Sequence, residues 1–315
     1  MILEVQHETR LEYSQAVTEW VAEFRLEPVS DGGQTCHSFH LKCSQPTSVF
    51  RYQDGFGNRV HHFNLRAPQA EVRVLAASLV ETHPAPRELA TSKAKYPLDA
   101  GPLDTVDFLQ FRGPVRRTPR LDPVLDALRP SAGTPLHALV LAVTAYINGY
   151  FAYAKDVTSV SSPIDDVLQL GKGVCQDFAH LMIAVLRSFG VPARYVSGYV
   201  HRPNKESQSH AWCEAWLPDL GWVGLDPTNN RPVDDHFVTV AIGRDFTDVP
   251  PNKGVYCGLG QESIGVRVET RELERLPPLS WLDQLPPLQV PLTAIRKSLP
   301  AEPSVHQETQ QTQQQ

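Results

Sequence analysis

The segment between residues 171 and 226 constrains the fold of this chain most, because it predicts one helix followed by a two-stranded hairpin. It begins GKGVCQDFAHLMIAVLRSFG and later reads SHAWCEAWLPDLGWVGLDPTNN. In the first part, apolar residues follow the i, i+3, i+4, i+7 spacing of a helix with one buried face. Gly190 and Pro192 then end the helix. The segment therefore predicts an α+β unit in which a helix packs on an antiparallel sheet.

Cys175 falls at the start of the predicted helix, after the flexible approach of Gly171 and Gly173. Backbone N–H groups without intrahelical partners and the positive end of the helix dipole gather at such a position. Both favour a thiolate over a thiol, so Cys175 is a candidate nucleophile. The alternative is that Cys175 is a small buried apolar residue, as most free cysteines are.

The hairpin supplies a candidate base and a candidate orienting carboxylate. Residues 210–217 alternate between two faces, and residues 222–226 return after a turn. If Trp216 lies opposite Trp222, Asp226 is diagonal to His210 on the same face, close enough for the side chains to meet. A shift by one residue would move Asp226 to the other face. For His210 alone, a hydrogen bond to the backbone is the competing interpretation.

These residues together resemble the transglutaminase-like superfamily, whose papain-related core carries Cys, His and Asp on a helix start and two adjacent strands. The matching positions are Gly173, Cys175, Ala179, His210, Ala211, Trp212, Glu214, Gly221, Trp222 and residues 226–229. The resemblance implies that Cys175 is the nucleophile, His210 the base and Asp226 the third member of a catalytic triad. It joins three separated motifs, which makes it specific.

Over about residues 1–272, the chain resembles the bacterial branch of that superfamily, in which a small β-domain precedes the core. Its markers are the turn at 52–58, the run at 243–250 and Gly254. We expect a small N-terminal β-sandwich at 1–83, a proline- and charge-rich connector at 84–131 and a transglutaminase-like, papain-like core at 132–272. Residues 238–240 and 265–268 are expected to extend the core sheet. Residues 273–315 are rich in proline and glutamine, and their composition predicts disorder.

Other residues near the predicted triad are weaker candidates for the site. Gln169 lies six residues before Cys175, where papain-like enzymes carry an oxyanion-hole glutamine, although the superfamily often uses another residue. The backbone N–H of Cys175 is an alternative donor. Tyr153 and Trp212 are candidates for the walls of the site, although aromatic residues at such positions are more often core.

Several polar residues are expected to have structural roles instead. Asp165 and Asp166 stand in the first turn of a short predicted helix, where the dipole favours acids. His180 is five residues after Cys175 and is expected to point away from it, so His210 is preferred as the base. Glu214 is also expected to be structural.

Composition and charge argue against several classes of function. The net charge of −6 does not favour nucleic acid or an anionic membrane, and no apolar run is long enough to span a bilayer. The N-terminus lacks the pattern of a secretory signal. Five cysteines at irregular spacing argue against a disulfide framework, which suits a cytoplasmic thiol enzyme.

No metal or other cofactor is expected from the sequence. The cluster of Cys36, His37, His40 and Cys43 would divide between the two faces of a strand and would not converge on a zinc ion. The chain also lacks the calcium-loop pattern.

Two classes of function follow from this reading. The first is a thiol enzyme that acts on amide or peptide bonds of a protein or peptide substrate through a thioester, either as a transglutaminase-like acyltransferase or as a cysteine peptidase or amidase. The second is a non-catalytic binding scaffold with the same fold. Glutamines in the terminal run ETQQTQQQ are possible acyl donors for a transglutaminase, but a solvated tail explains them more simply.

Overall fold

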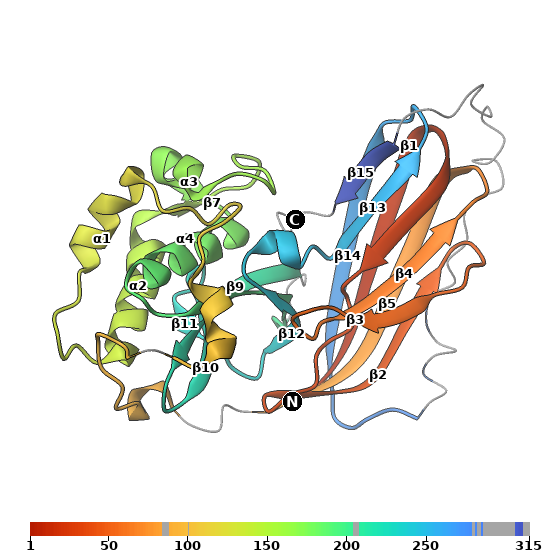
Figure 1. The fold of residues 1–315 in the computed structure, drawn as a ribbon. Helices are drawn as coiled ribbons and strands as arrows, with labels where there is room; N and C mark the ends of the chain where they lie inside the picture. Colours follow the sequence, from red (N-terminus) through yellow and green to blue (C-terminus); the bar gives the residue numbers. More distant parts are fainter. Residues whose placement is uncertain are drawn as a thin grey trace.

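A computed structural model describes residues 1–83, 88–99, 101–203, 208–278, 281, 285 and 306–310. A helical and sheet core and an antiparallel β-domain lie side by side, with β12 (Phe237–Gly243) between them (Figure 1). The predicted α+β class, with a β-domain before a transglutaminase-like core, is confirmed. None of the helices in the described ranges is long and apolar enough to cross a membrane.

The β-domain is organised around β1 (Ile2–Phe24), a strand of 23 residues that changes partners along its length. Its first half pairs with β5 (Gln69–Thr82) and β14 (Glu262–Leu273). Its second half pairs with β4 (Arg59–Leu65) and β13 (Asn252–Cys257). A register irregularity between the two halves lets the sheet curl over a core that includes Trp20, Phe24 and Phe63. The outer strands are β2 (Gln34–Cys43), which pairs with β5, and β3 (Phe50–Gln53), which pairs with β4.

The C-terminal part of the chain departs from the sequence-based expectation. Residues 265–268, expected in the core sheet, lie in β14 and pair with β1, for example Val268 with His7. An alternating strand pattern specifies two faces but not which sheet the strand joins. The expected disorder of 273–315 does not hold for Trp281 and Leu285, which are buried against Leu75 and Leu79. Residues 306–310 form β15 (His306–Gln310) beside β13. Apart from residues 274–278, the rest of this tail lies outside the described residues.

The core sheet has the strand order β11-β10-β9-β8-β12. It contains β8 (Ala193–Val200), β9 (Gln208–Leu217), β10 (Gly221–Asp226) and β11 (Arg231–Pro232) besides β12. The apolar helix α4 (Cys175–Ser188) is buried almost completely between this sheet and the helices α2 (Leu136–Tyr150) and α3 (Ile164–Leu170). The predicted connector contributes α1 (Asp122–Leu128) and three short 3-10 helices: η1 (Leu89–Thr91), η2 (Leu103–Leu109) and η3 (Pro119–Leu121). A rigid helix is therefore fixed on the sheet with its first residue at one end.

Two amide side chains of the β-domain bind the backbone of β12, which is the last strand of the core sheet. Asn58 donates to Ile242 O and accepts from Ile242 N, both at 2.8 Å. Gln34 makes the same pair of bonds with Thr239, also at 2.8 Å. The side chains satisfy polar groups that an edge strand would otherwise leave open. This explains structurally why a buried asparagine ends the 52–58 turn.

Candidate active site

Cys175 is the first residue of α4, and the polar residues that follow it fix this position. The carboxylate of Asp177 turns back and accepts a hydrogen bond from the Val174 N–H at 2.8 Å. Gly173 makes room for this turn, since a Cβ there would lie 2.8 Å from Asp177 Oδ2. The helix start thus has its backbone satisfied by its own third residue.

The first turn of α4 also holds the preceding loop. The Thr158 hydroxyl donates to Asp177 at 2.7 Å, and the Gln176 amide donates to Val160 O at 3.0 Å. Burial raises the pKa of Asp177, while its hydrogen bonds with Thr158 and Val174 oppose the shift. Two partly buried hydrogen bonds therefore hold the loop at residues 158–160 against the helix start.

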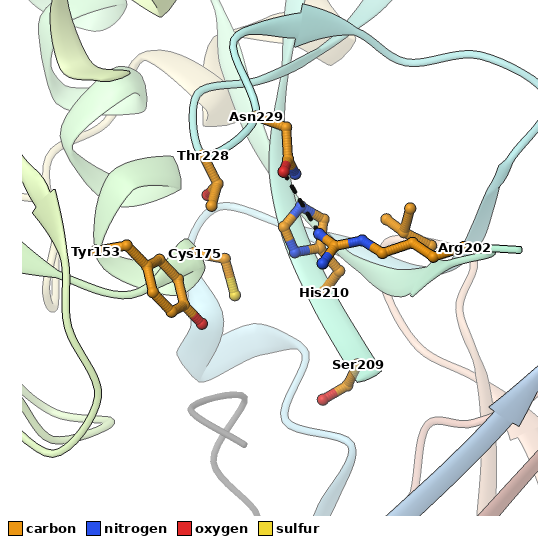
Figure 2. A pocket seen from close by; sticks show the side chains of 8 residues that line it. Tyr153, Cys175, Arg202, Ser209, His210, Thr228 and Asn229 are labelled. Atoms are coloured by element: carbon orange, nitrogen blue, oxygen red, sulfur yellow. Dashed lines mark hydrogen bonds between the residues drawn. The ribbon is translucent and has the colours of Figure 1, made fainter. Parts of the chain in front are cut away.

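A short parallel strand pair brings Tyr153 to the site. It joins β6 (Ala152–Tyr153) to β7 (Lys172–Gly173), with Tyr153 opposite Gly173, two residues before Cys175. Figure 2 shows the Tyr153 hydroxyl directed towards the Cys175 sulfur. Burial and then the nearby Cys175 raise the pKa of Tyr153 to about 12, so the phenol keeps its proton at neutral pH.

His210 and Asp226 meet across the hairpin, as the predicted register requires. Trp222 is opposite Trp216 and Leu225 opposite Cys213, which puts Asp226 on the His210 face. His210 Nε2 lies 2.8 Å from Asp226 Oδ2. His210 is also in contact with the Cys175 side chain, for which Nδ1 is the remaining ring nitrogen. The structure thus brings the three side chains of the predicted triad into one chain of contacts.

Asp226 is completely buried and is held by the turn that follows it. Its Oδ1 accepts the N–H of Thr228 at 2.9 Å and that of Asn229 at 3.2 Å, and Oδ2 also accepts the Asn229 side-chain amide. Burial alone would raise the pKa of Asp226, but the positive charge of His210 and the hydrogen bonds from His210 and Asn229 lower it. A buried, ionised carboxylate therefore faces the imidazole.

The environment of His210 favours the charged imidazolium. Burial lowers its pKa, but the charge and hydrogen bond of Asp226 and the contact with Cys175 outweigh burial and raise the pKa to about 10. An imidazolium beside a cysteine is the arrangement that activates a thiol nucleophile.

Cys175 and His210 border a partly open cavity of about 270 Å³, and Asp226 lies buried behind His210. Its lining consists of Tyr153, Cys175, Val200, Arg202, Ser209, His210, Thr228 and Asn229 (Figure 2). Arg202 and Ser209 belong to the polar segment 201–209, for which the sequence predicts a loop that borders a substrate groove. Sequence reasoning missed Val200, Thr228 and Asn229 as lining residues, and the signal for the last two was the Thr-Asn pair after Asp226 and Pro227.

The weaker candidates have different positions. Tyr153 lines the cavity, whereas Gln169 is exposed on α3 and is not part of the lining. Trp212 is completely buried behind His210, with ring centroids 6.3 Å apart, and packs edge-on against Phe237. The six-residue spacing before Cys175 did not place Gln169 at the cavity, because Gln169 lies in α3 and β7 separates this helix from Cys175.

His180 lies on α4 but takes no part in this cavity. Its Nε2 accepts the Phe246 N–H at 3.1 Å, and burial, together with the charge of Arg187, lowers its pKa to about 3. It is therefore neutral at physiological pH and fixed to the 3-10 helix η4 (Phe246–Asp248).

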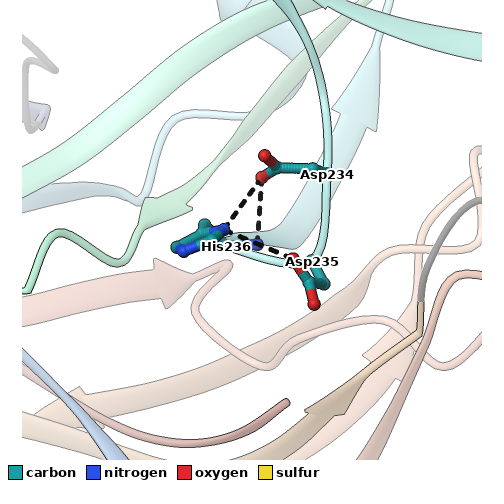
Figure 3. A group of neighbouring side chains, drawn as sticks. All are labelled: Asp234, Asp235 and His236. Carbon is teal, nitrogen blue, oxygen red and sulfur yellow. Dashed lines mark hydrogen bonds and ion pairs between the residues drawn. The ribbon is translucent and has the colours of Figure 1, made fainter.

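Potential metal ligands are not concentrated at the cavity. In the described part of the chain, the one group of three His, Cys or acidic side chains close enough to share an ion is Asp234, Asp235 and His236 (Figure 3). His236 Nδ1 lies 3.3 Å from an oxygen of each aspartate. These side chains are more than a third exposed, and their contacts are explained as surface ion pairs.

Comparison with known families places the chain in one of them. Residues 125–227 match the transglutaminase-like superfamily, and residues 3–81 match the bacterial transglutaminase-like N-terminal region. The protein belongs to the transglutaminase-like superfamily, in its bacterial form with an N-terminal β-domain.

Relatives extend over most of the chain. An uncharacterized protein of Mycobacterium leprae is 34% identical over 86% of this chain and 99% of its own length. A protein-glutamine gamma-glutamyltransferase of Pseudomonas aeruginosa is 35% identical over 36% of this chain and 19% of its own length. A crystal structure of a candidate cysteine protease from Cytophaga hutchinsonii has the same fold, with a TM-score of 0.74 at 20% identity, over 88% of this chain and 93% of that one.

Proposed function

We propose that the protein is a thiol acyltransferase that attacks a carboxamide or peptide carbonyl through Cys175, His210 and Asp226. The observation that carries the proposal is the continuous contact from the Cys175 side chain through His210 to the buried Asp226. A nucleophile, a base and an orienting group in this order form the arrangement on which thiol acyl transfer depends. The substrate is a protein or peptide that presents such a group.

The reaction proceeds in two halves. The Cys175 thiolate forms a C–S bond to the carbonyl carbon, and the negative charge moves to the carbonyl oxygen. As the tetrahedral intermediate collapses, the C–N bond breaks and His210 gives its proton to the leaving amine, which leaves a thioester on Cys175. An amine or water then attacks the thioester, His210 takes its proton, and the thiolate is released.

The developing oxyanion needs hydrogen-bond donors near Cys175. The Cys175 N–H stands at the first position of α4, where helix geometry provides no intrahelical acceptor. The Tyr153 hydroxyl, which is protonated at neutral pH, is the second donor that we assign to this site. Exposed Gln169 is not assigned this role.

Acyl transfer to an amine is preferred over hydrolysis because the Pseudomonas aeruginosa relative, which is 35% identical over 36% of this chain, bears the name of a glutamyltransferase. A peptidase or amidase would use the same side chains with water as the acceptor. A non-catalytic scaffold would not require the His210 imidazole to be paired with a completely buried carboxylate.

The experiment combines selective labelling with mass spectrometry. Cys175 should react with iodoacetamide before buried Cys213, whose pKa is raised by burial, and His210→Ala should slow the reaction at Cys175. Glutaminyl peptides are then incubated with and without a primary amine. An amine adduct supports transfer and a glutamate product supports hydrolysis. Both products should disappear in Cys175→Ala.

Equal labelling of all five cysteines, with no thioester on Cys175 for any glutaminyl peptide, would contradict the proposed thiol enzyme. The non-catalytic binding scaffold would then be the better explanation. Cys213→Ala is a matched control, because Cys213 is buried in the same core but does not line the cavity. This variant should retain the labelling rate at Cys175.

A further inference from the structure

Among the described residues that line the cavity, Arg202 is the one with a permanent positive charge, and none of them is an aspartate or a glutamate. It follows the end of β8, on the wall opposite Tyr153 in Figure 2. A cation in a lining of this composition favours a positive potential at the place where the substrate is proposed to bind.

The guanidinium of Arg202 is held only loosely by the described part of the protein. Its Nη2 donates to Asn229 Oδ1 at 3.4 Å, near the upper limit for a hydrogen bond. By contrast, Arg194 pairs with Glu214 at 2.6 Å and Arg231 with Asp234 at 2.6 Å. A guanidinium carries five N–H donors in a planar fork, and the described residues provide this one printed acceptor for them.

Asn229 links Arg202 to the triad. The Asn229 side chain donates to Asp226 Oδ2 while its carbonyl oxygen accepts from Arg202. The contact places Arg202 beside His210 at a position set by the turn after β10. A ligand atom bound by Arg202 would thus lie next to the side chains that we propose to be reactive.

The charge of Arg202 also acts across the cavity. Burial and Cys175 raise the pKa of Tyr153, and Arg202 opposes this rise from the other wall. A volume of about 270 Å³ is sufficient for a group of side-chain size together with a neighbouring carboxylate.

We infer that Arg202 forms an anion-binding subsite and selects acyl donors that carry a carboxylate close to the reacting amide. The inference rests on the proposed thiol chemistry of Cys175 and adds the class of donor. A free C-terminal carboxylate and the side chain of an adjacent Asp or Glu have the same chemistry, and a guanidinium fork binds either with two N–H groups.

The first test does not require turnover. Iodoacetate is negatively charged and iodoacetamide is neutral, and both alkylate the same sulfur. The ratio of the iodoacetate rate to the iodoacetamide rate at Cys175 therefore reports the local potential. His210 attracts iodoacetate in every variant, and the change on Arg202→Gln isolates Arg202. We expect the ratio to fall about five- to tenfold in Arg202→Gln and less in Arg202→Lys.

Arg129→Gln is the matched control for net charge, because Arg129 is largely exposed near the end of α1, away from the cavity lining. The ratio should be unchanged in this variant. The same ratio in Arg202→Gln as in the wild type would overturn the inference.

The second test uses glutaminyl peptides in matched sets. One set carries Glu or Gln beside the reacting residue, and the other ends in a free carboxylate or a carboxamide. We expect the preferred acidic member to lose about tenfold in kcat/KM in Arg202→Gln while its neutral counterpart changes little. The set that responds identifies the position of the carboxylate.

The two proposals fail differently. If the wild type turns over acidic and neutral peptides equally well, the proposed anion-binding subsite is overturned, but the proposal of a thiol enzyme stands. No turnover of any peptide would contradict acyl transfer. The ratio of the iodoacetate rate to the iodoacetamide rate would still decide whether Arg202 forms an anion-binding subsite.

Discussion

Asp226 accepts a hydrogen bond from His210 Nε2 at 2.8 Å while it is completely buried and bound by the turn at Thr228 and Asn229. The imidazole is thereby oriented with its other nitrogen towards Cys175. The same carboxylate is the largest of the influences that raise the pKa of His210. Asp226 therefore controls both the direction and the charge of the proposed base.

Replacing Asp226 with Asn should lower kcat/KM by about 10²–10⁴-fold, since a neutral amide neither stabilises the imidazolium nor fixes its tautomer. The pKa of His210 should fall from about 10, so the loss of activity at high pH should begin at a lower pH than in the wild type. A pH series of kcat/KM for both proteins checks this. An unchanged basic limb would show that Asp226 does not set the charge of His210.

The two buried histidines near Cys175 are expected to differ sharply in their effect on catalysis. His210→Gln should abolish measurable turnover. His180→Gln should change kcat/KM by less than about tenfold, because His180 binds the Phe246 N–H and lies outside the cavity lining. Circular dichroism should first establish that both variants are folded. A similar loss in both would argue against the distinct role assigned to His210.

Much of the site could be predicted because its parts are local in sequence. The helix pattern placed Cys175 at its first turn, and the hairpin register placed Asp226 on the face of His210. For Arg202 the sequence predicts only a polar loop at the border of a groove, and Asn229 was not predicted as a lining residue. They stand in loops, and their approach depends on how the strands β8 and β10 end.

The arrangement of the β-domain was less accessible to sequence reasoning. The 23-residue strand β1 joins two halves of the sheet, and β14 returns to it from more than 200 positions away. Pairing over such separations depends on total burial, which a local alternation of polar and apolar residues does not encode. Trp281 was likewise assigned to a disordered tail because the surrounding composition is rich in proline.

Asp177 is expected to be important for stability and for the position of the nucleophile. Asp177→Ala removes the acceptor for the Val174 N–H and for Thr158. We expect a loss of about 1–3 kcal/mol in the free energy of unfolding and a lower rate of Cys175 alkylation. Urea denaturation and labelling kinetics measure the two effects. Asp126→Ala, at a largely exposed site in α1, should cost less than about 1 kcal/mol.

The contact between Asn58 and Ile242 should link the stability of the β-domain to that of the core. Asn58→Ala leaves the Ile242 N–H and C=O without these partners, which should cost about 2–4 kcal/mol. Urea denaturation checks this, with Asn64→Ala as the control because the Asn64 side chain is exposed on the adjacent strand β4. A cost no larger than that of the control would mean that β12 does not depend on this contact.

The charge of His210 also predicts how stability depends on pH. The folded-state pKa of about 10 is above the unfolded value of about 6.5. The stabilisation from the imidazolium is therefore fully present below about pH 6.5 and is lost as pH rises towards 10. In that window the folded state binds one more proton at this site, so stability falls by at most about 1.4 kcal/mol per pH unit.

The measurement is made in the Cys175→Ala background, so that His210 is the one member of the Cys175–His210 pair that remains. Removing Cys175 also removes one of the influences that raise the pKa of His210, so the decline should end at a pH below 10 while Asp226 still maintains it. Urea denaturation from pH 6 to pH 9 should show this decline in Cys175→Ala and a weaker one in Cys175→Ala/His210→Gln. Parallel curves of unfolding free energy against pH for the two proteins would mean that folding does not stabilise the charged form of His210. Asp226 would then not hold His210 as an imidazolium.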